Sequence, residues 1–172
     1  MSKYLGRDTR SIQKSIVEHV EYTLAMTRFD FSHFGCFQAV AYSLRDRMLE
    51  SLNDTNSYLM HQAARRVNII SPDYSLGRMA PIFLLNNGLT QNYKIALSEL
   101  DFNLNEVLLE ENDFEIGTGP SLKQMQRPTR IGLTITEAEV RGCLAADLID
   151  STVSFNLPSV AYGIKFTQAS AN

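Results

Sequence analysis

The sequence lacks the features that mark several common classes of protein. It has only two cysteines, Cys36 and Cys143, which fit neither a disulfide framework nor a zinc-ligand spacing. Its apolar runs fall far short of the ~18 residues that a membrane-spanning helix requires, and its first ten residues have no apolar segment of the signal-peptide type. There is no basic excess, because 16 lysines and arginines stand against 19 acidic residues, for a net charge of −3. We therefore expect no disulfide framework, no membrane span and no nucleic-acid partner.

What is present is typical of one globular domain. The 172 residues are 44% hydrophobic and 20% charged, which is sufficient for a sizeable core. We expect residues 1–172 to form a single domain or a large part of one. The two cysteines are expected to be buried as small hydrophobic residues in a reducing, cytoplasmic environment.

Hydrophobic periodicity predicts two helices near the start of the chain. From about Thr9 to Arg28, apolar side chains recur every three to four residues, and Asp8 or Thr9 is placed to cap the first turn. After a break, Ser32 is placed to cap a second helix that keeps apolar spacing for roughly six turns. The apolar positions of this second helix are Phe37, Val40, Ala41, Leu44, Met48, Leu52, Thr55 and Leu59.

The rest of the chain alternates short helices with two short strands. Residues 65–71 and 160–166 are predicted to be strands that pair in parallel. Short helices are expected from 81 to 87, from Thr90 onward and from 104 to 111, and Gly88 is expected to end the first of these. These elements predict an α/β fold that is predominantly helical.

Two further segments complete the prediction. Residues from about 112 to 136 are broken by glycines and prolines, so a long loop is expected there. Thr136 and Glu139 have the spacing of a capping box at the start of a last helix, which is expected to end near Asn156. That helix is predicted to be amphipathic, with a face formed by Val140, Cys143, Leu144, Leu148, Ser151 and Phe155.

Four separated blocks of the sequence resemble the N-terminal part of the α-glucan (glycogen or starch) phosphorylases. They occur in the order and at the spacing found in that family, apart from an altered segment around the expected loop. The blocks are residues 11–25, residues 41–47, Asn87-Gly88-Leu89 with Asn92-Tyr93-Lys94, and Leu144-Ala145-Ala146 followed by Asp150-Ser151, Asn156-Leu157-Pro158 and Tyr162-Gly163-Ile164.

The resemblance implies part of a large two-domain fold of the glycosyltransferase-B type. The family uses pyridoxal phosphate to cleave the ends of α-1,4-glucans with inorganic phosphate, which releases glucose 1-phosphate. The family's cofactor lysine, its main phosphate-binding residues and most of its sugar contacts lie in sequence that follows the part resembled here. We therefore expect no catalytic, cofactor-binding or metal-binding residues in this chain.

The family carries a glycine-rich loop, Gly-Asn-Gly-Gly-Leu-Gly-Arg-Leu, before the helix that matches from Gly142 onward. Such a loop lets backbone amides approach an anion at the positive end of a helix. By the resemblance, Glu137, Glu139 and Val140 replace family glycines and Ala138 replaces the asparagine. Acidic residues in the first helical turn satisfy the helix dipole and disfavour phosphate, so a plain capped helix is expected there.

A second family pattern, Ser-x-Glu-Phe-x-x-Gly-Arg, resembles the segment that runs from Ser71 to Arg78. Arg78 is the best remaining candidate for a substrate or phosphate contact, with a structural ion pair or helix cap as its alternative role. Some family members also bind a nucleotide on the second helix, but the matching positions lack the aromatic residue and the glutamine pair, so we predict no AMP binding. These positions are Leu52, Asn56, Ser57 and Met60.

Two functional hypotheses remain open from the sequence. In the first, the chain is part of an active phosphorylase that is completed by another chain. In the second, it is a non-catalytic relative that kept its helices and acts by association with itself, with a full-length phosphorylase or with a larger assembly. The sequence does not decide its oligomeric state or whether Ser11 or Ser15 is phosphorylated.

Overall fold

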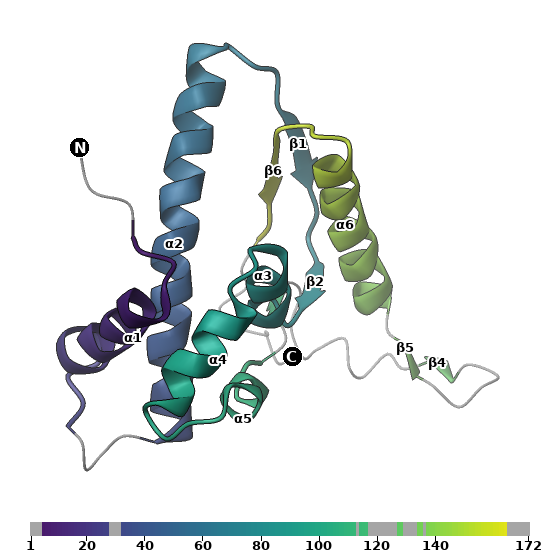
Figure 1. The fold of residues 1–172 in the computed structure, drawn as a ribbon. Coiled ribbons are helices and arrows are strands. Elements are labelled where there is room, and N and C mark those ends of the chain that lie inside the picture. The colour runs from purple at the N-terminus through teal and green to yellow at the C-terminus, as the bar shows by residue number, and fades with distance from the viewer. Residues whose placement is uncertain are drawn as a thin grey trace. The chain divides into compact units, whose positions relative to one another are not determined.

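The computed structural model describes residues 5–27, 32–112, 114–116, 127–128, 134–135 and 137–164, with the backbone alone at 114–115, 127–128, 134–135 and 137–139. The elements follow one another as α1 (Thr9–Glu18), the π-helix η1 (His19–Thr23), α2 (His33–His61), β1 (Val67–Ile70), β2 (Tyr74–Gly77), α3 (Ala80–Asn86), α4 (Thr90–Ser98), α5 (Leu104–Leu109), β3 (Phe114–Ile116), β4 (Arg127–Pro128), β5 (Thr134–Ile135), α6 (Glu137–Ser154) and β6 (Ser159–Tyr162) (Figure 1).

The chain divides into two compact units. Unit 1 comprises Met1–Tyr58 and Arg78–Asn112, and unit 2 comprises Leu59–Gly77 and Asp113–Asn172. In the described residues, unit 1 is built from helices, whereas unit 2 holds all the strands together with α6. The predicted α/β composition, mostly helical with a short parallel strand pair, is confirmed.

Unit 1 is organised around a core of apolar side chains from α1, α2 and α4. Ile12 and Ile16 of α1, Val40 of α2 and Leu97 of α4 are fully excluded from solvent. Complete burial of such a side chain contributes roughly 1.5–3 kcal/mol, so these contacts hold the helices together. The other buried members of this core are Cys36, Ala39, Leu44, Leu84, Leu89, Tyr93, Ala96, Leu104 and Val107.

Helix α1 begins with a side-chain cap and ends in a change of helix type. The carboxylate of Asp8 accepts hydrogen bonds from the Ser11 hydroxyl at 2.7 Å and from the Ser11 amide at 3.0 Å. These bonds favour the charged carboxylate and so lower the pKa of Asp8. The predicted single helix over 9–28 is interrupted after Glu18, where the backbone continues as the π-helix η1.

Helix α2 begins where predicted but buries only part of its apolar face. The hydroxyl oxygen of Ser32 caps its start by accepting a hydrogen bond from the Gly35 amide at 3.1 Å. Leu44 is buried, whereas Met48 and Leu52 are 48% and 50% exposed. Periodicity identifies which face of a helix is apolar, but it does not reveal how far a neighbouring element extends along that face.

The three predicted short helices of unit 1 are present as α3, α4 and α5. Pro81 lies in the first turn of α3, where its missing amide proton costs no intrahelical bond. Gly88 follows the helix with a φ of +65°, a left-handed conformation that glycine adopts without strain. The side chain of Asn103 caps α5 by accepting a hydrogen bond from the Asn105 amide at 2.9 Å.

The two cysteines differ in environment. Cys36 is fully buried in the core of unit 1, and burial raises the pKa of its thiol to about 12. Cys143 lies on α6 and is exposed. The prediction that both cysteines are buried is confirmed for Cys36 and is wrong for Cys143.

Unit 2 contains the predicted parallel strand pair. Val67 of β1 lies opposite Ser159 of β6, and Ile70 lies opposite Tyr162. Strand β6 is shorter and begins earlier than the predicted 160–166, and residues 165–166 of that prediction lie outside the described residues. In the described part of the chain, neither strand pairs with a third.

Two antiparallel pairs also occur, and the sequence did not predict them. Strand β2 pairs with β3, with Tyr74 opposite Ile116, and β4 pairs with β5, with Arg127 opposite Ile135. Strands β3, β4 and β5 fall within residues 112–136, where a long loop was expected. Strands of two to four residues carry too little alternation for periodicity to reveal them.

Helix α6 packs on the strands through its small residues. It lies alongside β1 and β2 (Figure 1). A Cβ added at Gly142 would lie 3.0 Å from the Cβ of Ser75 in β2. Ala145 is only 4% exposed, whereas Leu144 is 60% exposed. The predicted helix is present, but it contacts the strands through small residues rather than through its leucine positions, because close approach of a helix to a strand requires small side chains.

Candidate functional site

The first candidate site is the start of α6, the position at which the family that the sequence resembles carries its glycine-rich loop. Helix α6 begins at Glu137, so Glu137, Ala138 and Glu139 form its first turn. Val140 follows and is 57% exposed, while the predicted cap Thr136 lies outside the described residues. A carboxylate in the first turn of a helix stabilises it by about 0.3–1 kcal/mol and repels a second anion. This backbone is a helix start with acidic residues rather than an open loop of glycine amides.

Gly142 is the glycine that the resemblance retains, and its role in this fold is packing. The Cβ of an alanine at this position would lie 3.0 Å from the Ser75 amide nitrogen as well as from the Ser75 side chain. The hydrogen atom of glycine is therefore what allows α6 to approach β2 so closely.

The carboxyl ends of β1 and β6 are joined by a buried tyrosine. The hydroxyl group of Tyr74 lies 3.0 Å from the Ile69 carbonyl oxygen and 2.9 Å from the Tyr162 carbonyl oxygen, so its proton is shared between the two strands. Tyr74 is 4% exposed. Ligands of open α/β sheets usually bind beyond the carboxyl ends of the strands. In unit 2 the tyrosine hydroxyl occupies that position.

Asp73 is buried beside this tyrosine and forms an ion pair with α6. The Nε atom of Arg141 donates to Oδ2 of Asp73 at 2.9 Å, and the hydroxyl group of Ser71 donates to the Asp73 carbonyl oxygen at 2.8 Å. Ser71, Asp73 and Tyr74, the positions that resemble the family's Ser-x-Glu-Phe pattern, therefore make bonds within unit 2. Sequence reasoning missed the pair with Arg141, because its partners are 68 residues apart and share no local pattern.

Arg78 lies two residues before α3 and is exposed. The amides that begin α3 bind a carboxylate from the same unit, because Oε1 of Glu111 accepts from Met79 N at 2.9 Å and from Ala80 N at 3.0 Å. A phosphate bound between Arg78 and this helix start would have to displace Glu111. The backbone donors beside Arg78 are therefore engaged.

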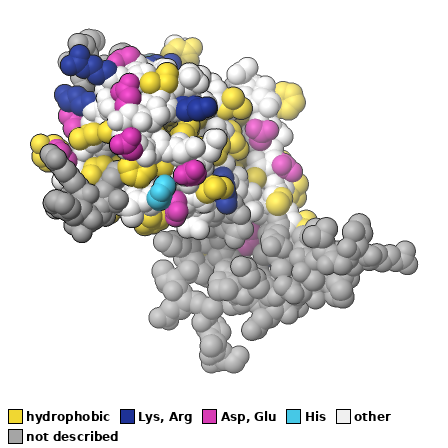
Figure 2. All heavy atoms as spheres, turned by 60° about the horizontal axis from the view of Figure 1, so that its bottom comes forward, with side chains coloured by type: hydrophobic (Ala, Val, Ile, Leu, Met, Phe, Trp, Pro, Cys, Tyr) yellow, Lys and Arg dark blue, Asp and Glu magenta, His cyan; other side chains and the backbone are white. Residues whose placement is uncertain are grey.

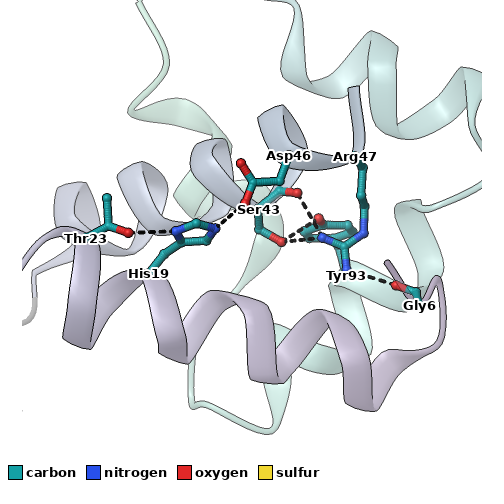
Figure 3. Close-up of polar contacts among 7 residues, drawn as sticks. All are labelled: Gly6, His19, Thr23, Ser43, Asp46, Arg47 and Tyr93. Atoms are coloured by element: carbon teal, nitrogen blue, oxygen red, sulfur yellow. Dashed lines mark hydrogen bonds and ion pairs between the residues drawn. The ribbon is translucent and has the colours of Figure 1, made fainter. Parts of the chain in front are cut away.

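A buried polar network, which the sequence did not reveal, lies in unit 1 between α2 and α4 (Figure 3). Arg47 is 6% exposed and donates to the carbonyl oxygen and the hydroxyl oxygen of Ser43, both at 2.8 Å, and to the Gly6 carbonyl oxygen at 2.9 Å. The hydroxyl groups of Ser43 and Tyr93 are 2.9 Å apart, and the guanidinium carbon lies 5.8 Å from the centre of the Tyr93 ring. Burial raises the pKa of Tyr93, against the opposing effects of the Ser43 hydrogen bond and the Arg47 charge.

A cavity of about 230 Å³ adjoins this network within unit 1. Its charged lining residues are two arginines, Arg7 and Arg47, and two acidic residues, Glu50 and Asp54. The Glu50 carboxylate accepts a hydrogen bond from the Leu5 amide at 2.9 Å. Equal numbers of positive and negative side chains give the cavity no net attraction for phosphate.

His19 has a structural role in the same unit. Its Nε2 atom lies 3.1 Å from Oδ2 of Asp46 on α2, and its Nδ1 atom lies 2.9 Å from Oγ1 of Thr23 (Figure 3). The contact with Asp46 ties the π-helix η1 to α2, whereas the contact with Thr23 lies within η1. Over the described ranges, no group of three or more histidine, cysteine, aspartate or glutamate residues is placed to hold a metal ion.

The contacts of Ser11 and Ser15 in α1 disfavour their phosphorylation. The hydroxyl group of Ser11 donates to Asp8, and Ser15 is only 7% exposed on the inner side of the helix. A phosphate on Ser15 would place about two negative charges in an apolar core. Modification of Ser15 therefore requires α1 to detach from the core.

The lysines in the described ranges are not placed to hold pyridoxal phosphate. A lysine that holds this cofactor as a Schiff base needs a shielded pocket that lowers its pKa. The lysines in the described ranges are Lys14 and Lys94, and both lie exposed on helices. Neither of these lysines is therefore a candidate for the Schiff base through which the cofactor is held.

The described surface agrees with the balanced charge of the sequence. Lysine and arginine side chains are interspersed with aspartate and glutamate over the face shown in Figure 2, and apolar side chains lie among them. None of the described helices combines the length and the apolar character needed to cross a membrane.

Comparison with known proteins identifies relatives along nearly the whole chain. Glycogen phosphorylase 2 of Dictyostelium discoideum is 35% identical over 166 residues, which cover 96% of this chain and 15% of the relative. Glycogen phosphorylase of Pasteurella multocida is 31% identical over 91% of this chain and 17% of the relative. The α-glucan phosphorylase H isozyme of Solanum tuberosum is 28% identical over 94% of this chain and 17% of the relative. No family model matches the chain. The chain thus spans about one sixth of the length of these relatives.

Proposed function

This chain is a homologue of the glycogen and α-glucan phosphorylases, and we propose that it is a phosphorylase-like protein of glucan metabolism that acts through protein association without catalysing phosphorolysis alone. Its partner is a second copy, a phosphorylase-type polypeptide or a larger assembly. The observation that carries this proposal is the presence of carboxylates at both candidate anion sites.

The carboxylate at the first of these sites belongs to Glu111. Glu111 accepts hydrogen bonds from both amides at the start of α3, next to Arg78. At the start of α6, Glu137 and Glu139 stand where the family resemblance places glycines. Each helix start would otherwise offer amide donors to a phosphate group. The carboxylates at these two helix starts support a protein that keeps the family's helices and strands without its phosphate contacts.

The alternative is an active phosphorylase whose remaining parts come from another chain. The close packing of α6 on β2 at Gly142 favours it, because this packing fixes the helix that would carry the glycine-rich loop. In that case the positions of Glu137, Ala138, Glu139 and Val140 would face the substrate phosphate only after assembly.

Phosphorolysis assays with the purified full chain separate these proposals. The chain is incubated with an α-1,4-glucan, inorganic phosphate and pyridoxal phosphate, and glucose 1-phosphate is measured. We expect no product from the chain alone, and light scattering of the native protein is expected to show an oligomer or a complex. Product formed by the chain alone would contradict the proposed lack of catalysis.

The second arm of the experiment adds a phosphorylase-type polypeptide from which the aligned segment has been removed. A complex without product supports the non-catalytic proposal. A complex with product supports the alternative, and restoring the family residues through Glu137→Gly, Ala138→Asn, Glu139→Gly and Val140→Gly should then increase the rate. A monomeric chain that binds no added polypeptide would contradict association.

A further inference from the structure

The cavity of unit 1, with a volume of about 230 Å³, is lined by the segment before α1, by one face of α2 and by the end of α3 with the residues that follow it. Helix α2 contributes Arg47, Glu50, Ser51 and Asp54, whose spacing of three to four residues places them on the same side of the helix. Pockets for drug-sized ligands usually measure about 300–1,000 Å³. The cavity is therefore suited to a smaller molecule.

Arg47 brings a buried positive charge to this cavity. It is 6% exposed, and the hydrogen bonds that it makes with described residues all go to neutral oxygen atoms of Ser43 and Gly6 (Figure 3). Its Nε atom is excluded from solvent and has no hydrogen-bond partner in the described part of the chain. A buried charge is costly unless an opposite charge lies beside it. An anionic group in the cavity next to Arg47 would therefore be stabilised.

The acidic residues of the cavity lie further along the same side of α2. Glu50 and Asp54 follow Arg47 by three and seven residues, so Asp54 is displaced by about 10 Å along the helix axis. The carboxylate of Glu50 already accepts an N–H group, that of Leu5, at 2.9 Å. The charges that α2 contributes are thus ordered, with the cation at one end of the series and two acceptors for a positively charged donor after it.

The other lining residues add a second cation and an apolar wall. Arg7 donates to the Asn87 carbonyl oxygen at 2.9 Å, which joins the segment before α1 to the end of α3. Leu5, Phe83 and Leu89 are the apolar members of the lining. Apolar surface of a ligand that is buried against them contributes roughly 25 cal/mol per Å².

This lining disfavours most simple classes of small ligand. The acidic residues repel a phosphate or another polyanion, and the two arginines repel an amine that carries no anionic group. An uncharged sugar leaves the charge of Arg47 without an opposite charge. A molecule that carries one negative and one positive group, together with an apolar side chain, matches all parts of the lining.

We propose that this cavity binds a small apolar α-amino acid of about the size of leucine, with its carboxylate towards Arg47, its ammonium group towards Glu50 and Asp54, and its side chain against Phe83 and Leu89. The proposal is independent of the proposed association, because every residue that it uses belongs to unit 1 of a single chain.

The first test compares ligands that differ in one group. The full chain is titrated with L-leucine, with isocaproate, which lacks the ammonium group, with isoamylamine, which lacks the carboxylate, and with glucose. Binding is followed by ligand-observed NMR up to ~10 mM ligand. We expect L-leucine to bind with a Kd of ~1 mM or below, and each of the other three ligands to bind at least ~tenfold more weakly.

The second test locates the site. Ser51→Phe places an aromatic ring in the cavity and is expected to abolish leucine binding, whereas the control Ser57→Phe, at an exposed position six residues further along α2, should bind leucine normally. Asp54→Asn should weaken leucine binding by ~threefold without weakening that of isocaproate. Asp150→Asn, at an exposed aspartate of unit 2, is the control for this loss of charge. Thermal unfolding shows whether each variant is folded.

Absence of leucine binding up to ~10 mM would overturn the inference and leave the proposed association intact. Isocaproate or isoamylamine that binds as tightly as leucine would contradict recognition of both charged groups, and tighter binding of glucose would identify an uncharged ligand instead. Equal loss of leucine binding in Ser51→Phe and Ser57→Phe would contradict the location of the site. If Ser51→Phe does not fold, an unchanged affinity of Asp54→Asn for leucine would overturn the location.

Discussion

The buried carboxylate of Asp73 and the guanidinium group of Arg141 form the ion pair that joins the segment after β1 to α6 in unit 2, with Nε and Oδ2 2.9 Å apart. The side chain of Asp73 is 4% exposed, whereas that of Arg141 is 44% exposed. The aspartate is thus removed from water and depends on protein partners, while the arginine remains partly hydrated. Such asymmetry makes loss of the arginine more costly than loss of an ordinary surface charge.

Arg141→Ala is expected to lower the free energy of unfolding by about 1–3 kcal/mol, because it removes a charged partner from a buried carboxylate. Urea unfolding followed by circular dichroism measures the change. Arg65→Ala, at an exposed arginine of the same unit, serves as the control and is expected to change the free energy by less than ~0.5 kcal/mol. Equal effects of the two substitutions would contradict a stabilising role for the ion pair.

Gly142→Ala is expected to destabilise the protein by about 1 kcal/mol or more, because the new methyl group meets the Ser75 backbone at 3.0 Å. The sign of the change in the free energy of unfolding is informative, since alanine at an unconstrained helix position would stabilise the protein by about 1 kcal/mol relative to glycine. Cys143→Ala, at the next and exposed position, is the control for the same chemical unfolding measurement. A more stable Gly142→Ala variant would show that α6 does not need this close approach.

The two thiols are expected to differ strongly in reactivity. At pH 8, a thiol reagent should modify Cys143 rapidly and Cys36 only on unfolding, because Cys36 is buried and its thiol has a pKa raised to about 12. Intact-mass spectrometry of the native chain should therefore show one modification, and two after denaturation in urea. Cys143→Ser should leave the native chain unmodified. Rapid modification of that variant would contradict the buried position of Cys36.

Stability is expected to fall at alkaline pH. The folded chain keeps the Cys36 thiol protonated up to its pKa of about 12, whereas the unfolded chain loses this proton near the ordinary pKa of 9.0. Above pH 9 the unfolded chain thus binds fewer protons, so the free energy of unfolding decreases as the pH rises towards 12. Tyr93, whose pKa burial raises above 10.0, adds to this decrease above pH 10.

Urea midpoints measured from pH 7 to pH 11 test this dependence. Cys36→Ala should reduce the slope that begins near pH 9, and Tyr93→Phe should reduce the additional slope above pH 10. A Cys143→Ala control should retain the wild-type slope. Identical slopes for all variants would contradict the assignment of the alkaline loss to these two buried groups.

The sequence predicts the elements whose causes are local. The caps at Asp8 and Ser32, the helix end at Gly88 and the β-branched run of β1 are each encoded within a few neighbouring residues, and all are present. The parallel pairing of β1 with β6 is also confirmed, because two short strands separated by a long segment with helices favour a parallel arrangement.

The failures involve partners that are distant in the chain. Periodicity identifies the apolar side of α6, yet the helix packs by its small residues because Gly142 and Ala145 permit a closer approach to β2 than leucine does. The network around Arg47 depends on Ser43, four residues away, but also on Tyr93 and Gly6 from other segments. Arginine in the middle of a helix is usually a surface residue, so nothing local indicates its burial.

The candidate sites follow the same division. The sequence locates the acidic first turn of α6 correctly, because helix starts are encoded locally. It does not locate Glu111 at the start of α3, since a cap supplied from 31 residues away has no signature in either segment. The position of the Glu111 carboxylate beside Arg78 is therefore revealed by the structure and not by the sequence.

The tyrosine that fastens β1 to β6 has a consequence for the order of folding. Its acceptor at Tyr162 lies 88 residues downstream, and the whole of Arg78–Asn112 belongs to the other unit. During synthesis, the helices of unit 1 can assemble before β6, the pairing partner of β1, has been made. Long-range pairing of this kind is slow and leaves strand edges exposed meanwhile. The nascent chain thus has an interval in which a half-built sheet is the segment most in need of a chaperone.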